Sequence, residues 1–180
     1  MRALSAPPLL LEPLVAAHAD EMVRVLSDPA IYEFENTPPT SKDVLRQRYT
    51  MLERRRSPDD AETWLNWVIR LPTGDVAGYM QATVLSSCTS YVAYELASRY
   101  WRQGIGTTAL AAVLTELRLH YGVRRYVAVL KSRNHRSRAL LRKLHFAPAR
   151  PEEATQLHLE SDEIAMIRPA DESNSADSET

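Results

Sequence analysis

Apolar and polar positions along the chain follow strand-like and helix-like patterns that predict a series of short elements. Alternation over residues 64–71 places Leu65, Trp67, Ile69 and Leu71 on one side of a strand. A hairpin turn at residues 72–75 and a return strand over residues 76–85 follow. Helical spacing predicts helices over residues 16–27 and 40–56, the second starting at a capping-box-like Thr40 and Asp43.

The rest of the chain continues this mixture of strands and helices. A long helix is expected after Thr107 and a short one ending at Leu144, and further strands are expected at residues 9–14, 91–96, 126–130, 156–159 and 163–168. Helices that lie between hairpin-joined strands indicate an α/β fold with a mixed sheet rather than an all-parallel one.

Composition and charge narrow the class of protein. A chain of 180 residues that is 44% apolar predicts one domain with a full core, over residues 1–170, followed by a disordered acidic tail at 171–180. The net charge of −1 argues against general nucleic-acid binding. No apolar run approaches the roughly 20 residues of a membrane span. The start of the chain lacks a signal-peptide layout, and the single cysteine, Cys88, excludes an internal disulfide, so a cytoplasmic location is expected.

A glycine-containing turn between a strand and a long helix carries the clearest chemical signal. Gly104 and Gly106 precede an apolar helix for which Thr107 is the expected N-cap. The unpaired N–H groups and the positive dipole end of such a helix bind phosphate. The turn also matches a relaxed dinucleotide-binding fingerprint, but the expected acidic residue about 20 positions later is missing. An ordinary glycine loop before a surface helix stays open as the alternative.

A second motif about 20 residues past this helix gives the turn a family context. Gly-turn, helix, strand, Asn-x-x-Ser, helix and Leu-x-Phe in this order resemble the GNAT superfamily of acetyl-CoA-dependent N-acetyltransferases, in wording closest to its RimJ/RimL branch. The matching residues are Tyr94, Leu96, Trp101, Gly104, Gly106, Thr107, Asn134, Ser137, Leu140, Leu144 and Phe146. The chain departs from the pattern at Thr108 and His145. It also has Leu141 where many members carry a tyrosine acid.

The resemblance implies a fold and a co-substrate site. The expected fold is a single GNAT-like domain with a mixed, mostly antiparallel twisted sheet, about four flanking helices and splayed central strands. Acetyl-CoA would lie between the strands at 91–96 and 126–130, with its pantetheine on the main chain near Leu96. The residues expected to hold the diphosphate through their amides are Arg102, Gln103, Gly104, Ile105, Gly106 and Thr107, and Asn134 would also bond CoA; no metal is expected. The basic cluster at 131–138 would offset phosphate charge, or is a solvated turn or a nucleic-acid patch.

Direct transfer to an amine needs a proton acceptor and a group that stabilises the departing thiolate. Glu95, beside the expected thioester, is the first candidate base, with a surface carboxylate as the alternative. His158 and Glu160 are reserve bases on a predicted strand, and a water chain is also possible. Ser137 would donate a hydrogen bond to the CoA sulfur, or only cap its helix. The absence of a placed Cys/His or Ser/His/Asp set favours direct attack without an acyl-enzyme.

The resemblance also implies that the connection between the first two helices borders the acceptor pocket. Tyr32, Glu33, Phe34 and Glu35 offer two carboxylates and two aromatic rings, which suit a cationic amine. The alternative is a proline-terminated surface loop with its aromatic rings in the core. The sequence does not distinguish a protein N-terminus from a small-molecule amine, or a monomer from a homodimer. A non-catalytic acyl-CoA sensor and a nucleotide-binding protein of unrelated chemistry are the rival functions.

Overall fold

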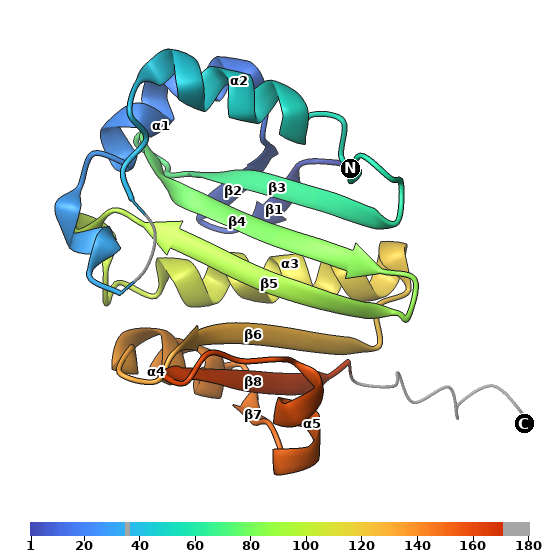
Figure 1. Ribbon diagram of the computed structural model, residues 1–180. Helices are drawn as coiled ribbons and strands as arrows, with labels where there is room; N and C mark the ends of the chain where they lie inside the picture. The colour runs from blue at the N-terminus through green and yellow to red at the C-terminus, as the bar shows by residue number, and fades with distance from the viewer. Residues whose placement is uncertain (35–36, 171–180) are drawn as a thin grey trace, which may run out of the picture.

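An open sheet forms the centre of the computed structural model, which describes residues 1–34 and 37–170. Within these ranges the sheet has eight strands in the order β1-β2-β3-β4-β5-β6-β8-β7 (Figure 1). Their bounds are β1 Leu4–Ala6, β2 Leu9–Pro13, β3 Glu62–Arg70, β4 Val76–Leu85, β5 Thr89–Leu96, β6 Arg125–Lys131, β7 Ala147–Pro148 and β8 Glu163–Pro169. All neighbours pair antiparallel except β5 and β6, which confirms the expected mixed, mostly antiparallel sheet.

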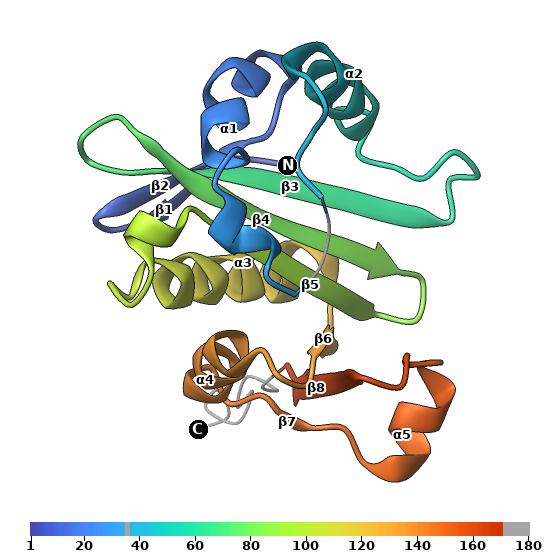
Figure 2. The ribbon, with the colours of Figure 1, turned by 60° about the vertical axis from the view of Figure 1, so that its left-hand side comes forward.

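Helices cover both faces of this sheet. The α-helices of the described residues are α1 Ala19–Val25, α2 Lys42–Leu52, α3 Ile105–Tyr121, α4 His135–Lys143 and α5 Pro151–Gln156, and short 3-10 helices lie at Ala16–His18, Pro29–Tyr32 and Ser98–Tyr100. Figures 1 and 2 show α1 and α2 together on one side of β3 and β4, and α3 on the other side. Among the described residues, no helix combines the length and the apolar character that crossing a membrane requires.

Strand β3 is buried on both faces because each face packs against its own helices. Leu65, Trp67 and Ile69 belong to the core under α3, as the alternation predicts. The residues between them turn to the other core, where Val68 packs with Met22 of α1 and other residues of α1 and α2. The fold therefore has one core on each side of the sheet.

Several predicted boundaries differ from the structure for local reasons. Helix α2 begins after Ser41, whose hydroxyl accepts the N–H of Val44 at 3.2 Å, and not after Thr40. The strand predicted at residues 156–159 is wrong. Pro151 starts the short helix α5 instead, and the Glu153 carboxylate accepts the N–H of Arg150 at 3.0 Å. The edge strand β1 has no counterpart in the prediction because three residues are too few to show a pattern.

The central strands β5 and β6 separate along their length, as expected. Only Thr89–Tyr91 pair with Arg125–Val127, although the strands continue to Leu96 and Lys131. Beyond the paired segment each strand keeps its outer partner, β4 for β5 and β8 for β6. The two halves of the sheet therefore part at the carboxyl ends of β5 and β6, next to the start of α3 and α4 (Figure 1).

Candidate active site

The parting of β5 and β6 opens into a cavity of about 790 Å³. It is lined by the end of β5, the turn before α3 and one side of α4 along its length, with Leu96, Trp101, Gly104, Thr107, Asn134 and Ser137 among its residues. The N-termini of α3 and α4 therefore face one cavity. Each presents the positive end of a helix dipole, and the first turn of α3 also has no side-chain cap for its N–H groups. This charge distribution suits a phosphorylated ligand.

The N-terminus of α3 has no side-chain cap. Gly104 is the N-cap residue in a left-handed conformation (φ +81°), and no side chain accepts the N–H groups of the first turn. Thr107, the cap expected from the sequence, instead lies in that turn. Arg102, Gly104, Ile105, Gly106 and Thr107 all line the cavity. The main-chain donors of this turn are therefore available to a ligand in the cavity.

Gly106 and the Gln103 side chain have structural roles at this turn. A Cβ at Gly106 would lie 2.8 Å from Cδ1 of Leu140, so this glycine allows α3 to pack closely against α4. The Gln103 side chain is exposed, does not line the cavity, and donates to the Arg99 carbonyl at 2.8 Å. Gln103 can therefore bind a diphosphate only through its main-chain N–H.

The main chain of Leu96 faces the opening between the strands. The N–H of Ala97 donates to Ala77 of β4 at 3.0 Å. Because consecutive residues of an antiparallel strand point their main-chain groups in opposite directions, those of Leu96 turn away from β4. The Leu96 carbonyl accepts the Trp101 indole N–H at 2.8 Å, which leaves the Leu96 N–H as the free main-chain donor at this position.

The start of α4 positions a serine beside a tyrosine. The Asn134 side chain caps the helix by accepting the Ser137 N–H at 3.0 Å, so Ser137 is not the cap. The Ser137 hydroxyl lies 2.7 Å from the Tyr94 hydroxyl of β5. Burial raises the pKa of Tyr94 to about 12 and thus keeps its phenol protonated. With the phenol as donor, the serine proton is free to point into the cavity.

Two residues of the basic cluster around α4, Lys131 and Arg136, are paired with carboxylates of the protein. Lys131 binds Glu160 at 2.6 Å and Asp162 at 2.9 Å. The Arg136 guanidinium lies 4.2 Å from the centre of the Trp101 ring and pairs with Glu33. These contacts oppose the reading of the cluster as a nucleic-acid patch, because fewer charges remain for a polyanion.

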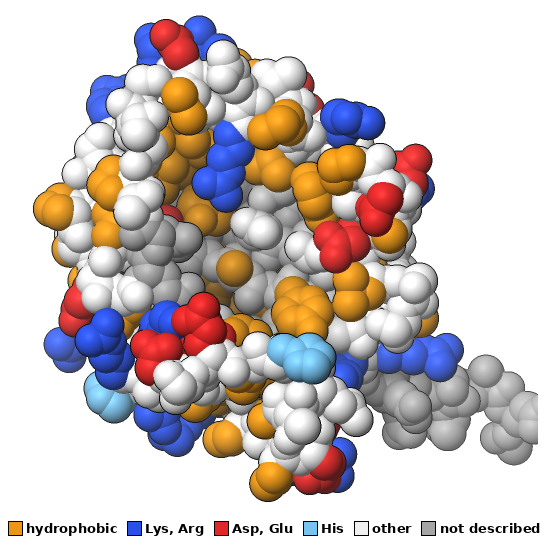
Figure 3. Space-filling view, viewed as in Figure 1, with side chains coloured by type: hydrophobic (Ala, Val, Ile, Leu, Met, Phe, Trp, Pro, Cys, Tyr) orange, Lys and Arg blue, Asp and Glu red, His pale blue; other side chains and the backbone are white. Residues whose placement is uncertain are grey.

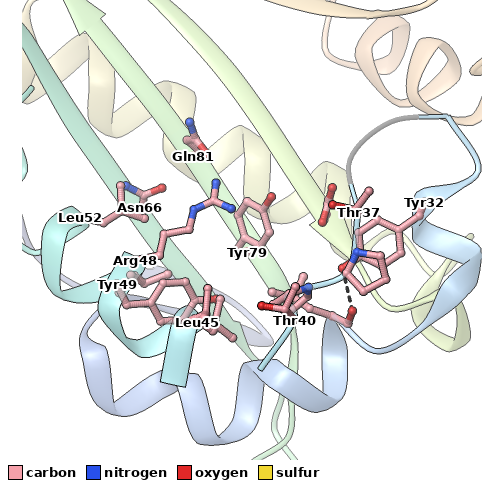
Figure 4. Close-up of a pocket in the computed structure, with 16 residues that line it drawn as sticks. Tyr32, Thr37, Thr40, Leu45, Arg48, Tyr49, Leu52, Asn66, Tyr79 and Gln81 are labelled. Atoms are coloured by element: carbon pink, nitrogen blue, oxygen red, sulfur yellow. Dashed lines mark hydrogen bonds between the residues drawn. The ribbon is translucent and has the colours of Figure 1, made fainter. Parts of the chain in front are cut away.

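A second cavity of about 350 Å³ lies between α2, the segment that leads into it, and the adjoining face of β3, β4 and β5. Figure 3 shows this face hollowed below α1 and α2, with hydrophobic side chains along its upper wall. Tyr32, Arg48, Tyr49, Asn66, Tyr79 and Gln81 are among the residues that line it (Figure 4). Glu95 lines this cavity and the larger one, so this residue lies where the two meet.

The predicted acceptor segment divides between the two cavities. Tyr32 lines the smaller cavity, and its hydroxyl donates to the Leu26 carbonyl at 2.7 Å. Phe34 lines the larger one, 5.4 Å from the Arg136 guanidinium. Glu33 lines neither cavity because it pairs with Arg136, and Glu35 lies outside the described residues.

The reserve bases lie away from both cavities. His158 follows α5 and is exposed, because the segment predicted as a strand is the end of a helix and a turn. Glu160 is exposed and paired with Lys131. Glu95 is thus the proposed base that the structure places at a cavity.

The sequence did not indicate the roles of several other residues that line the two cavities. Tyr94 stands in the family motif, but its role depends on the contact with Ser137. Asn66 is a polar residue inside an apolar strand pattern, and this is the signal that could have found it. Arg48 and Gln81 gave no signal, because one lies on a charged helix face and the other on an alternating strand.

A divided sheet, a cavity at the uncapped start of α3 and a second cavity that shares Glu95 are the arrangement expected of a transferase that brings two substrates together. The sequence profile of the acetyltransferase (GNAT) domain matches residues 8–147. The chain belongs to this family, and it is an acetyl-CoA-dependent N-acetyltransferase by class. The rival reading as a non-catalytic sensor is not favoured.

Solved structures of acetyltransferases share the fold. RimL, a ribosomal L7/L12 α-N-protein acetyltransferase in complex with coenzyme A, superimposes with a TM-score of 0.77 at 19% identity, covering 94% of this chain and 99% of that one. A ribosomal-protein-S5-alanine acetyltransferase from Vibrio fischeri gives 0.76 at 16% identity, with 94% and 97% covered. The microcin C7 self-immunity acetyltransferase MccE, in complex with acetyl-CoA and AMP, gives 0.70 at 16%, with 89% and 92% covered. A sequence search of curated proteins gave no match.

Proposed function

We propose that the protein acetylates a primary amine in a ternary complex, with acetyl-CoA in the larger cavity and the amine in the smaller one. The observation that carries this proposal is the position of Glu95 on both cavities. Among the described residues, Glu95 is the one that lines both cavities, so an amine in the smaller cavity and a thioester in the larger one would both lie beside it. No covalent acyl-enzyme is needed when both substrates meet at one point.

The larger cavity has the features that acetyl-CoA requires. The uncapped N-terminus of α3 offers donors for a diphosphate, and the Leu96 N–H offers one at the end of β5. Asn134 lines the same cavity and holds the start of α4. When bound there, acetyl-CoA supplies an acetyl group activated as a thioester.

Glu95 and Ser137 divide the proton chemistry between them. Glu95 accepts the proton of the incoming ammonium, directly or through a water, and so frees the nitrogen lone pair for attack. The Ser137 hydroxyl, held by Tyr94, donates a hydrogen bond toward the sulfur as the carbon–sulfur bond breaks. The Leu96 N–H would donate to the thioester carbonyl oxygen as that oxygen gains negative charge.

Release of free thiol from acetyl-CoA tests this function. The purified full chain is given acetyl-CoA and a panel of small amines, amino acids and short peptides. Thiol release that depends on the amine supports the proposal, whereas tight CoA binding without thiol release from any amine overturns it.

Substitution of the carboxylate then tests its role. Glu95→Gln is expected to lower kcat by about 100-fold, since a positioned base contributes roughly 10² to 10⁴ in rate. Affinity for CoA should change by less than about threefold. Glu152→Gln, an exposed carboxylate on α5, is the matched control and should keep the wild-type rate. A Glu95→Gln rate equal to wild type from about pH 6 to pH 9 excludes Glu95 as the base.

A further inference from the structure

The smaller cavity carries a cation as well as a carboxylate. Arg48 reaches from α2 across the cavity toward Tyr79 and Gln81 of β4 (Figure 4). Glu95 lines the cavity from β5, where it meets the larger one. The cavity is therefore bipolar, with a carboxylate where the amine must react and a guanidinium on the helix that covers the sheet.

Arg48 makes no ion pair or hydrogen bond with any residue in the described ranges. Arg46, on the same helix, pairs with Asp20 at 2.7 Å and points away from the cavity lining. Arg48 is exposed at the open side, so an entering ligand can reach it. An unpaired guanidinium that lines a binding cavity offers its planar set of N–H donors to a ligand.

A buried hydroxyl near this arginine also lacks a partner within the described chain. The Tyr49 hydroxyl is buried and makes no hydrogen bond to a described residue. Asn66 lines the same cavity, and its side-chain amide makes no hydrogen bond to a described residue. Since buried polar groups are satisfied as a rule, the Tyr49 hydroxyl indicates that a polar ligand completes the site.

The charges of Arg48 and Glu95 act on the same three phenols. Burial is the main cause that raises the pKa of Tyr32, Tyr49 and Tyr79, and the Glu95 carboxylate raises each pKa further. Arg48 opposes this effect at all three. Both charges therefore act on groups throughout the cavity. Glu95 would attract a simple cationic amine there, and Arg48 would repel it.

We propose that the acceptor is a small amino acid-like molecule whose carboxylate binds Arg48 while its amine faces Glu95. This inference rests on the proposed function and specifies its acceptor. A carboxylate matches the planar fork of arginine and cancels the repulsion that the amine would otherwise meet. The volume of about 350 Å³ lies at the small end of ligand sites and suits a molecule of amino-acid size.

Matched pairs of amines test the charge requirement. β-Alanine is compared with β-alanine amide, γ-aminobutyrate with its amide, and glutamate with a peptide that begins with glutamate. We expect wild-type protein to favour each carboxylate over its amide in kcat/KM. Arg48→Met should reduce this preference at least about tenfold, or about 1.4 kcal/mol, and Arg48→Lys should restore part of it. Comparing the same ratio between variants cancels the different basicity of the two amines.

Arg46→Met is the control, because it removes an arginine from the same helix without touching the cavity. Its preference should equal that of wild type. An absent preference in wild type, or one that survives in Arg48→Met, overturns the inference. Preference for the peptide over every free amino acid also overturns it, in favour of a protein N-terminus.

Binding gives a readout that is independent of turnover. Calorimetric titration of β-alanine and γ-aminobutyrate into the CoA complex should show Kd rising at least about tenfold in Arg48→Met. If no amine releases thiol, the proposed function fails while this titration still decides the role of Arg48. Equal affinity of wild type and Arg48→Met for both ligands refutes that role.

Discussion

Arg70 fastens α1 to the sheet, and its loss should destabilise the protein in a pH-dependent way. Its guanidinium, on β3, donates to Glu12 of β2 at 2.8 Å and to Glu21 of α1 at 2.5 Å. The Arg70 side chain is 20% exposed, and those of Glu12 and Glu21 are 27% and 36% exposed. The ion pairs between Arg70 and these two carboxylates therefore hold α1 against β2 and β3.

The size of the effect follows from these contacts. A hydrogen bond to a charged group contributes roughly 1.5 to 3 kcal/mol when shielded, and partial exposure lowers that figure. Arg70→Met should therefore reduce the free energy of unfolding by about 2 kcal/mol at neutral pH.

The sign of the pH dependence comes from the two carboxyl groups. Hydrogen bonds from Arg70 lower the pKa of Glu12 and of Glu21 in the folded protein. Their contribution to stability is complete above the ordinary glutamate pKa and disappears as the pH falls through the lowered values. The difference between wild type and Arg70→Met should thus shrink below about pH 4.

Urea unfolding at about pH 7 and about pH 3.5 measures this difference. Arg46→Met is the control, because the Arg46–Asp20 pair is exposed and should contribute less than about 1 kcal/mol. A loss in Arg70→Met that equals the control at neutral pH, or that grows on acidification, refutes the argument.

Two further predictions concern the larger cavity. Tyr94→Phe removes the phenol 2.7 Å from the Ser137 hydroxyl, so kcat should fall about fivefold, which corresponds to one neutral hydrogen bond of about 1 kcal/mol. The same change in a Ser137→Ala background should have no additional effect, and independent effects on kcat would contradict the pairing. Gly104→Val should raise the Kd for CoA at least about tenfold, measured by calorimetry. Gly74→Val is the control, because Gly74 has a φ of +89° in a hairpin remote from the cavity and the change introduces the same backbone strain. It should leave the Kd for CoA unchanged. Equal Kd values for the two variants would count against the α3 turn as the diphosphate site.

The sequence predicts the parts of this protein whose signals are local. Alternation in β3 and β4, helical spacing in α2 and α3, and the linked glycine and Asn-x-x-Ser motifs each depend on residues within about one element. The same local logic failed at residues 156–159, where a proline-started turn of helix outweighed a weak apolar pattern.

The acceptor side could not be predicted in this way, because its residues come from separate parts of the chain. Arg48 on α2, Asn66 on β3, Gln81 on β4 and Glu95 on β5 share one cavity only because α2 crosses the face of the sheet. The segment predicted to form this site sends Glu33 and Phe34 toward α4 instead.

The sequence by itself determined the family, the order of most elements and the turn that begins α3. Only the tertiary structure decided that Glu95 lies on two cavities and that Arg48 lines the smaller one with no ion pair or hydrogen bond to a described residue. The physical reason is that motifs record short-range backbone geometry, whereas a substrate cavity arises from side chains that meet across helices and strands distant in sequence.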